Sequence, residues 1–218
     1  MKSVASARGA QSCALERRKN NRFGQREFSN MRMRAIEKYF VNSQGHTLRV
    51  GRHTRQLLER IDIQSNWRYL DVGCGVGAGC EVAAGLGLNV TGIDVDPGQI
   101  EAARAAYPHI HFIVMDATKL QFNDSEFDIV ATSMATHHIP GWDRAFSEMI
   151  RVLRPGGYLI YSDFTFPSWL GSVGRYLIPF VGLPSAKLIE SLASEADLTR
   201  IHHARTGLTS DFIWLRRS

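Results

Sequence analysis

Nine residues, Asp71 to Gly79, read D-V-G-C-G-V-G-A-G and leave few folds open to this chain. They follow an apolar run and precede a segment with helical spacing, so they predict a glycine-rich turn between a strand and a helix. Glycine lets the backbone turn sharply and approach a ligand closely, because it has no Cβ. The helix behind the turn offers free N–H groups and a partial positive charge to an anionic group. The loop therefore predicts a ligand site within an α/β fold.

Short apolar runs continue to alternate with helical segments after this loop. We expect strands over Trp67–Val72, Leu88–Val95, Ile110–Met115, Phe127–Ser133 and Tyr158–Asp163, with helices to about Ala84, over Pro97–Ala106 and over Asp143–Leu153. Strands of this length that are apolar throughout and separated by helices predict parallel βαβ units with both faces covered. Helical spacing also precedes the loop, over Ala35–Ile63, with a break predicted at Asn42–Gly45.

The order of elements changes after Asp163. A helix over Ser185–Ala196 is followed by two strand-like runs, Thr199–Arg205 and Ser210–Arg216. The joint between these runs, at Thr206-Gly207-Leu208, is short enough for an antiparallel hairpin. The sequence thus predicts a doubly wound, mostly parallel, seven-stranded Rossmann-like sheet with an antiparallel last strand.

The chain has 218 residues, 44% of them hydrophobic, which suits one globular domain. We place that domain at 35–218, behind an arm at 1–34. Residues 1–40 hold ten lysines or arginines and three acids, a net charge of +7 in a chain of net charge +5. Such an arm binds nucleic acid or an anionic membrane surface, or is a solvated, flexible leader. Its arginine-rich, acid-poor start also resembles a transit peptide, which would make the protein organellar rather than cytoplasmic.

Few cysteines are present, namely Cys13, Cys74 and Cys80, and their spacing gives neither a disulfide framework nor a zinc site. This favours a reducing compartment such as the cytoplasm, and we expect no metal. No apolar stretch is long enough for a transmembrane helix. The oligomeric state stays open.

Three carboxylates stand at strand ends where a ligand of a parallel sheet is expected. Asp94 ends the second strand and can accept both hydroxyls of a ribose. Asp116 ends the third strand and can accept a hydrogen bond from the exocyclic amine of adenine. Asp71 stands at the glycine loop itself, where it would repel a pyrophosphate and attract an ammonium group.

Asp71 bears on the choice between two cofactors. Gly73, Gly75 and Ala78 also satisfy the dinucleotide pattern G-x-G-x-x-G/A, which alone is a weak signal. An acid two residues before the first glycine argues for the amino-acid end of S-adenosylmethionine instead. The open alternatives at this point are a dinucleotide-binding domain and a Rossmann-like domain that has lost its ligand.

Several blocks in order resemble the class I S-adenosylmethionine-dependent methyltransferases, of the small-molecule, ubiquinone-biosynthesis-like type. The blocks are Tyr69–Gly75, Val90–Asp94, Met115–Ala117, Phe127–Val130 running to Ile139, and Arg151–Gly157, within a resemblance that spans about residues 46–217. One departure from the family is Glu195-Ala196-Asp197-Leu198, where a glycine is usual at the Asp197 position; Asp tolerates a left-handed backbone fairly well.

The resemblance implies S-adenosylmethionine as cofactor, S-adenosylhomocysteine as product and a role for each matching position. Asp71 and the glycines would line the methionine moiety, Asp94 the ribose, and Asp116 with Ala117 the adenine. The predicted cofactor-binding residues are Asp71, Gly73, Cys74, Gly75, Gly77, Asp94, Val95, Asp116, Ala117, Ser133 and Met134.

Candidates for chemistry follow the fourth and fifth strands. His137 and His138 stand where substrate is expected, either as a general base or as residues that cap the loop or pack on the next helix. Asp163 ends the fifth strand, either in contact with substrate or capping the next turn. We expect Asp96 to cap a helix, and Asp128, His202 and His203 to be structural.

The segment 164–184 is rich in aromatic and aliphatic residues, among them Phe166, Trp169, Tyr176 and Phe180. It is interpreted as a lid over an apolar acceptor, with a helix packed on the core or a membrane-touching segment as alternatives. The predicted function is methyl transfer to a small, fairly apolar molecule. The rival predictions are a methyltransferase that acts on RNA or another nucleic acid through the basic arm, and a nicotinamide-dependent reductase.

Overall fold

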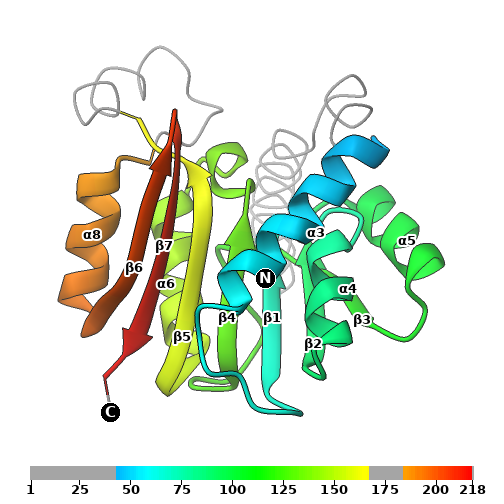
Figure 1. Cartoon of the computed structure of the whole chain (residues 1–218), viewed down its shortest axis with the longest axis horizontal. Coiled ribbons are helices and arrows are strands. Elements are labelled where there is room, and N and C mark those ends of the chain that lie inside the picture. Colours follow the sequence, from blue (N-terminus) through cyan, green and yellow to red (C-terminus); the bar gives the residue numbers. More distant parts are fainter. Residues whose placement is uncertain (1–42, 167–183, 218) are drawn as a thin grey trace, which may run out of the picture.

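The computed structural model describes residues 43–166 and 184–217, which form one sheet covered by helices (Figure 1). The elements are α3 (Gln44–Leu58), β1 (Arg68–Val72), α4 (Ala78–Gly85), β2 (Asn89–Asp94), α5 (Pro97–Ala106), β3 (His111–Val114), β4 (Phe127–Ser133), the 3₁₀ turn η1 (Thr136–His138), α6 (Trp142–Val152), β5 (Leu153–Phe164), α8 (Ala186–Glu195), β6 (Leu198–Thr206) and β7 (Thr209–Arg216).

The seven strands lie in the order β3-β2-β1-β4-β5-β7-β6. All neighbours from β3 to β5 are parallel, while β7 is antiparallel to both β5 and β6. The predicted fold class is therefore confirmed. The chain moves outward from β1 to β3 and then returns to place β4 on the other side of β1, which opens a crevice at the carboxyl ends of β1 and β4.

Helices cover both faces of the sheet (Figure 1). On one face, α3, α4 and α5 bury Leu58, Ala83 and Ile100 against strand residues such as Ile129. On the other face, α6 and α8 bury a second apolar cluster around Tyr161, Phe146 and Trp214. The apolar runs of the sequence reflect strands that are buried on both sides.

Two predicted boundaries differ from the structure. Helix α3 begins inside the break predicted at Asn42–Gly45, because the Ser43 hydroxyl accepts a hydrogen bond from His46 N and caps it. Strand β5 begins at Leu153, before the Pro-Gly-Gly sequence, because Leu153 already pairs with Phe127. The arm at 1–34 and residues 167–183 of the predicted lid lie outside the described residues.

Several residues predicted to be structural are so. The Asp96 side chain caps α5 by accepting from Gly98 N at 2.9 Å, and Pro97 occupies the first turn. At the opposite end of the sheet, Asp128 accepts from Arg68 N at 2.7 Å. The His203 ring stacks on Phe212, at 4.3 Å between centroids.

Candidate active site

A cavity of about 300 Å³ lies at the carboxyl ends of the parallel strands, between the strand-end loops and α3. It gathers nearly all the predicted site residues: Asp71, Gly73, Cys74, Gly75, Asp94, Val95, Asp116, Ala117, Ser133, Met134, His137 and His138. Residues up to 67 positions apart in sequence thus line one cavity, because parallel strands end at the same edge.

Two glycines of the loop, Gly73 and Gly75, line the cavity with positive φ angles. Gly73 has φ of +77°, and a Cβ there would lie 2.3 Å from the Cβ of Ala135. Gly75 has φ of +52°, and a Cβ there would meet no protein atom within 4 Å. The first glycine is required by close packing, whereas the second leaves space at the cavity wall that a ligand can fill.

Asp94 is oriented by the loop that it faces. One carboxylate oxygen accepts from Gly75 N at 3.0 Å and the other from Asp96 N at 2.9 Å. These bonds tie the end of β2 to the glycine loop, so the acid and the loop form one rigid wall. A carboxylate fixed in this way suits a diol such as ribose.

Asp116 stabilises its own turn. One of its oxygens accepts from both the N–H and the hydroxyl of Thr118, each at 2.8 Å. The residue lines the cavity between Met115 and Ala117. The turn therefore fixes its carboxyl group at the position predicted for adenine.

Asp71 is a buried carboxylate at the cavity, 6% exposed. Its pKa is raised from 3.8 to about 6, mainly by burial and also by the nearby Asp94. A hydrogen bond that the Cys80 thiol donates at 3.3 Å opposes this increase in the pKa. A positively charged ligand group at this place would replace the lost solvation of the carboxylate, so the site favours an ammonium group.

His137 and Asp163 form a tight pair at the far side of the cavity. His137 Nδ1 lies 2.5 Å from one Asp163 oxygen. The other oxygen accepts from Thr136 N at 2.7 Å and from the Thr136 hydroxyl at 2.6 Å. Burial alone would raise the pKa of Asp163, but these bonds outweigh it and hold the pKa below its ordinary value. An ionised Asp163 accepts from Nδ1–H, so the lone pair of a neutral His137 ring is on Nε2.

The segment between β4 and η1 contains a residue with an unusual backbone. Met134 has φ of +53°, a left-handed conformation that a side chain with a Cβ adopts only at some cost. Its N–H donates to Ser162 O at 2.8 Å, which ties the turn to β5. This turn directs Met134, His137 and His138 into the cavity.

Two of the predicted site residues lie outside the cavity lining. Gly77 does not line the cavity; it has φ of +84° at the start of α4, and a Cβ there would lie 2.8 Å from the Phe112 ring. Asp163 is fully buried beneath His137 and outside the cavity lining, which favours a supporting role over the predicted substrate contact. It is a positioning residue for His137.

One part of the cavity wall that the sequence did not predict comes from α3. His46, Thr47, Val50, Thr54 and Leu57 line the cavity from this helix. Four of them recur at helical spacing within the predicted helical segment Ala35–Ile63, and this spacing indicates that they share one face of the helix. Nothing in that spacing indicates that the face covers a cavity. Ile160 and Phe164 of β5 also line the cavity, as do Ala131 and Ile139.

The comparisons with known proteins agree with this geometry. Residues 70–161 match the family model described as "Methyltransferase domain". The demethylmenaquinone methyltransferase of Renibacterium salmoninarum is 34% identical over 129 residues, 59% of this chain and 53% of that protein. The 2-methyl-6-phytyl-1,4-hydroquinone methyltransferase of Synechocystis is 34% identical over 142 residues, 60% of this chain and 45% of that protein. The chain spans about half the length of the curated relatives it matches.

Among solved structures, the PH0226 protein of Pyrococcus horikoshii OT3 has a TM-score of 0.66 and 24% identity, and the match covers 81% of this chain and 93% of that protein. That likeness supports the fold. Residues 70–161 belong to the methyltransferase-domain family, and the chain carries a class I, Rossmann-like methyltransferase domain. The predicted resemblance is confirmed, and S-adenosylmethionine is the cofactor that this family and the site residues fit.

Two kinds of feature are absent from the described ranges, 43–166 and 184–217. No helix there combines the length and apolar character needed to cross a bilayer. No three His, Cys, Asp or Glu side chains there are grouped in a way that could hold a metal ion.

Proposed function

We propose that this protein transfers a methyl group from S-adenosylmethionine to a small, apolar acceptor. One observation carries the proposal: a single cavity joins a polar part to an apolar part. The polar part holds the glycine loop with Asp94 and Asp116. The apolar part is formed by Val50, Ile160 and Phe164, with His137 at its wall.

The sulfonium of the cofactor supplies an already activated methyl group, so the protein mainly orients the reactants and excludes water. Asp71, Asp94 and Asp116 would hold the ammonium, ribose and adenine groups. The apolar side chains of α3 and β5 would hold the acceptor in a site with little water.

A base is needed only where the acceptor loses a proton, as a hydroxyl does. His137 suits this role, because its Nδ1 is bonded to Asp163 and its Nε2 can then accept a proton. Asp163 stabilises the ring when it becomes positively charged. The His138 ring lies 3.9 Å from that of His137 and also lines the cavity.

Hydroquinones with an apolar tail are the acceptor class that we infer first. The relatives named above are a demethylmenaquinone and a phytylhydroquinone methyltransferase. A ring with a hydroxyl group would match the combination of an apolar wall and a histidine base.

The test is calorimetry of the full chain with S-adenosylmethionine, S-adenosylhomocysteine and NADH. We expect the first two to bind and NADH not to bind; the opposite result would reject methyl transfer. Asp94→Ala should weaken S-adenosylhomocysteine binding by about tenfold to a hundredfold, because hydrogen bonds to a charged group are lost. Release of S-adenosylhomocysteine with a panel of hydroquinones then tests the acceptor class.

Several finer assignments stay predictions. These are the boundary of the domain at residue 35, the flexible arm at 1–34, nucleic-acid binding through that arm, and a lid formed by 164–184. The cytoplasm is the proposed compartment, and an organelle is the alternative if the basic start of the chain is a transit peptide.

A further inference from the structure

Large exposed hydrophobic side chains are distributed unevenly over the described residues. Five exceed one third exposure: Leu48, Val114, Leu188, Ile201 and Leu208. All but Ile201 lie at or near the carboxyl edge of the sheet. Val114 ends β3, Leu188 is in the first turn of α8, and Leu208 is in the turn that follows β6. Leu48, which is 68% exposed, is in α3, next to the cavity-lining residue Thr47.

Basic side chains accompany these leucines. Arg49, Arg52 and Arg55 are exposed on α3, which contains no aspartate or glutamate. Elsewhere at the edge, Lys187 is next to Leu188, and Arg205 is exposed beside the β6–β7 turn. None of these five cations has an ion pair with a carboxylate of the described residues.

Glu59 is exposed one turn after Arg55, but the other carboxylates near this edge do not neutralise the rim. Asp71 and Asp163 are buried, and Asp94 and Asp116 are half-buried along the cavity. Asp143 at the start of α6 is exposed, but it is followed by the exposed Arg144. The outer surface around the cavity is therefore basic with apolar points.

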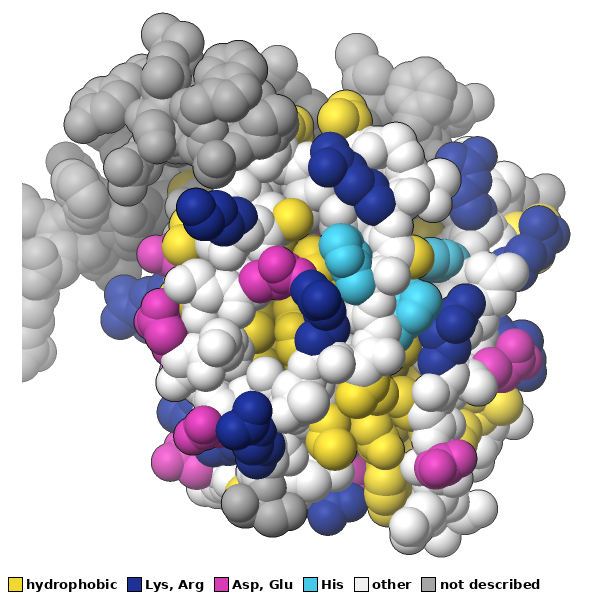
Figure 2. All heavy atoms as spheres, turned by 60° about the vertical axis from the view of Figure 1, so that its left-hand side comes forward, with side chains coloured by type: hydrophobic (Ala, Val, Ile, Leu, Met, Phe, Trp, Pro, Cys, Tyr) yellow, Lys and Arg dark blue, Asp and Glu magenta, His cyan; other side chains and the backbone are white. Residues whose placement is uncertain are grey.

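Figure 2 shows Lys and Arg side chains on several sides of a group of histidines on one face of the molecule. Burial lowers the pKa of His203, and the nearby Arg200 and Arg205 lower it further. His203 is therefore mainly neutral near pH 7, so the positive charge beside the β6–β7 turn comes from arginines such as Arg205 and not from this histidine.

Helix α3 links this outer surface to the cavity. His46, Val50 and Thr54 point into the cavity, while Leu48, Arg52 and Arg55 are on the exposed side of the same helix. His53 Nε2 lies 3.1 Å from an oxygen of Asp211 in β7, which joins α3 to the hairpin that carries Leu208. A surface that contacts the exposed side of α3 is thus one helix diameter from the cavity.

We propose that this carboxyl edge docks on an anionic phospholipid surface, which delivers the acceptor to the cavity. Unpaired arginines attract lipid phosphates, and leucines between them enter the headgroup region. The docking itself stands on the surface alone; the delivery of an apolar acceptor rests on the function proposed above. An RNA backbone would use the arginines but offers no environment for four exposed apolar side chains, so lipid is the better partner.

The first experiment is co-sedimentation of the full chain with vesicles of phosphatidylcholine, with and without about a third of phosphatidylglycerol. We expect binding to the anionic vesicles only. Arg52→Glu with Arg55→Glu should weaken it by about tenfold or more, because each basic residue near such a surface contributes separately. The matched control is Arg60→Glu with Arg217→Glu, which changes the net charge equally but away from the rim. The control should keep most of the binding.

A second pair of variants separates the apolar part from charge alone. Leu48→Asn should weaken vesicle binding several-fold, and Ile201→Asn, exposed in the middle of β6, should not. S-adenosylhomocysteine affinity, measured for each variant, shows that the cavity is intact.

Equal losses in both charge-reversed doubles would overturn the proposal, as would equal binding to neutral and anionic vesicles. Binding of the wild-type chain to RNA but not to vesicles would also reject it and favour a nucleic-acid partner. Vesicle binding does not depend on catalysis, so a failure of the proposed function would appear separately, as a loss of cofactor binding in the wild-type chain.

Discussion

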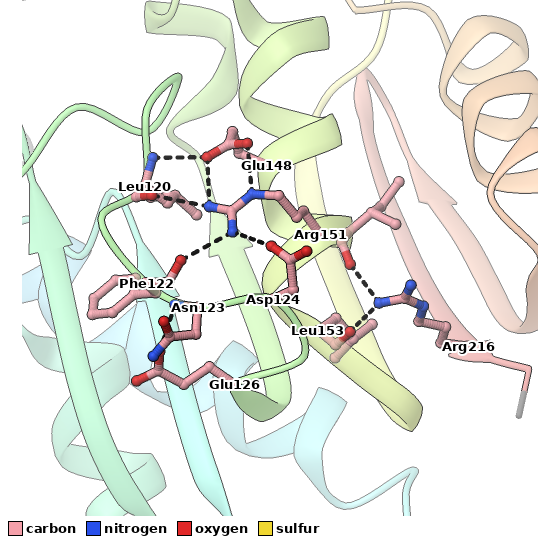
Figure 3. A network of polar contacts seen from close by, with 10 residues as sticks. Leu120, Phe122, Asn123, Asp124, Glu126, Glu148, Arg151, Leu153 and Arg216 are labelled. Carbon is pink, nitrogen blue, oxygen red and sulfur yellow. Dashed lines mark hydrogen bonds and ion pairs between the residues drawn. The ribbon is translucent and has the colours of Figure 1, made fainter.

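Arginines and carboxylates pair with one another at the amino end of the sheet, whereas key carboxylates at the carboxyl end have no lysine or arginine partner. Near the start of β4, Arg151 is bonded to Glu148 at 2.8 and 2.9 Å and to Asp124 at 2.6 Å (Figure 3). Its guanidinium also donates to the carbonyls of Leu120 and Phe122. At the carboxyl end, within the described ranges, Asp71 and Asp163 are bonded to neither a lysine nor an arginine.

The difference separates a stabilising region from a functional one. Arg151, Glu148 and Asp124 neutralise one another and fix a loop, so they need no ligand to balance their charges. Among the described residues, the side-chain donor to Asp71 is the Cys80 thiol, a weak donor, and the pKa of Asp71 is raised to about 6. The ionised Asp71 therefore lowers the free energy of unfolding unless a cation binds beside it. Such a cost is expected where a site is prepared for a ligand.

The largest effect is expected at the His137–Asp163 pair. His137→Ala should lower kcat by about 10² to 10⁴-fold with an acceptor that loses a proton, because a general base contributes about that much. S-adenosylhomocysteine affinity should change little, since His137 lies at the acceptor side. Asp163→Asn should follow the same pattern with a shifted pH profile. If both variants keep the wild-type kcat, the pair is structural and the cavity needs no base.

Asp71→Asn should make the protein more stable and the cofactor site weaker. The folded pKa of Asp71 is about 6 against an ordinary 3.8, so folding holds the proton more tightly. Stability therefore falls as pH rises from about 4 to 6, and the cost is fully present at pH 7. A shift of two pKa units corresponds to about 3 kcal/mol, which the amide avoids by carrying no charge.

Two measurements check this expectation. Urea unfolding at pH 7 should show the gain in stability without ligand. Calorimetry should show that the wild-type chain binds S-adenosylhomocysteine less tightly below about pH 6, where Asp71 is protonated. The Asp71→Asn variant should lack this pH dependence. If its affinity equals that of the wild-type chain at pH 7, Asp71 does not hold the ammonium group.

The amino end should respond in the opposite way. Arg151→Ala removes five hydrogen bonds and leaves Glu148, 22% exposed, without its partner. We expect a loss of about 2 to 3 kcal/mol in the free energy of unfolding, with unchanged S-adenosylhomocysteine affinity. Lys119 is an exposed residue of the same loop between β3 and β4, so Lys119→Ala is the control and should change neither quantity. A strong effect on cofactor affinity would show that the two ends are coupled.

The sequence predicted the polar part of the cavity far better than its apolar part. Gly73, Asp94 and Asp116 stand directly after strands, and parallel strands must bring their carboxyl ends together. Val50 and Thr54 lie on a helix whose position relative to the sheet depends on packing and on the His53–Asp211 contact, 158 residues apart. No spacing rule encodes such a contact.

The role of Asp163 stayed open between two alternatives for a related reason. Its place at the end of β5 matches a substrate contact as well as a buried support, and only the positions of Thr136 and His137 distinguish the two. Gly77 likewise belongs to a glycine-rich pattern, but its positive φ serves the start of α4 and the close approach of Phe112. Sequence identifies the loop, whereas packing decides which glycine faces the ligand.

The smallest effect concerns the contact that holds α3 to β7. His53 Nε2 lies 3.1 Å from both the Ser162 hydroxyl and Asp211, and the Ser162 hydroxyl donates to the same Asp211 oxygen at 2.7 Å. The hydrogen bond to Asp211 raises the pKa of His53 against the effect of burial. The resulting stability is complete below pH 6.5 and is lost as pH rises through the folded pKa.

His53→Gln should therefore destabilise the protein by up to about 1 kcal/mol near pH 5.5 and by less at pH 8.5, as expected for a partly exposed ion pair. Urea unfolding of both chains across this range measures the difference. Burial raises the pKa of Asp211, but the hydrogen bonds from His53 and Ser162 lower it more. The pKa of Asp211 is therefore below its ordinary value, and Asp211 stays ionised throughout this range. Since His202 also faces Asp211, His202→Gln is the control. A difference that is constant with pH would mean that His53 holds α3 as a neutral hydrogen-bond donor, and the position of the cavity wall would then not depend on protonation.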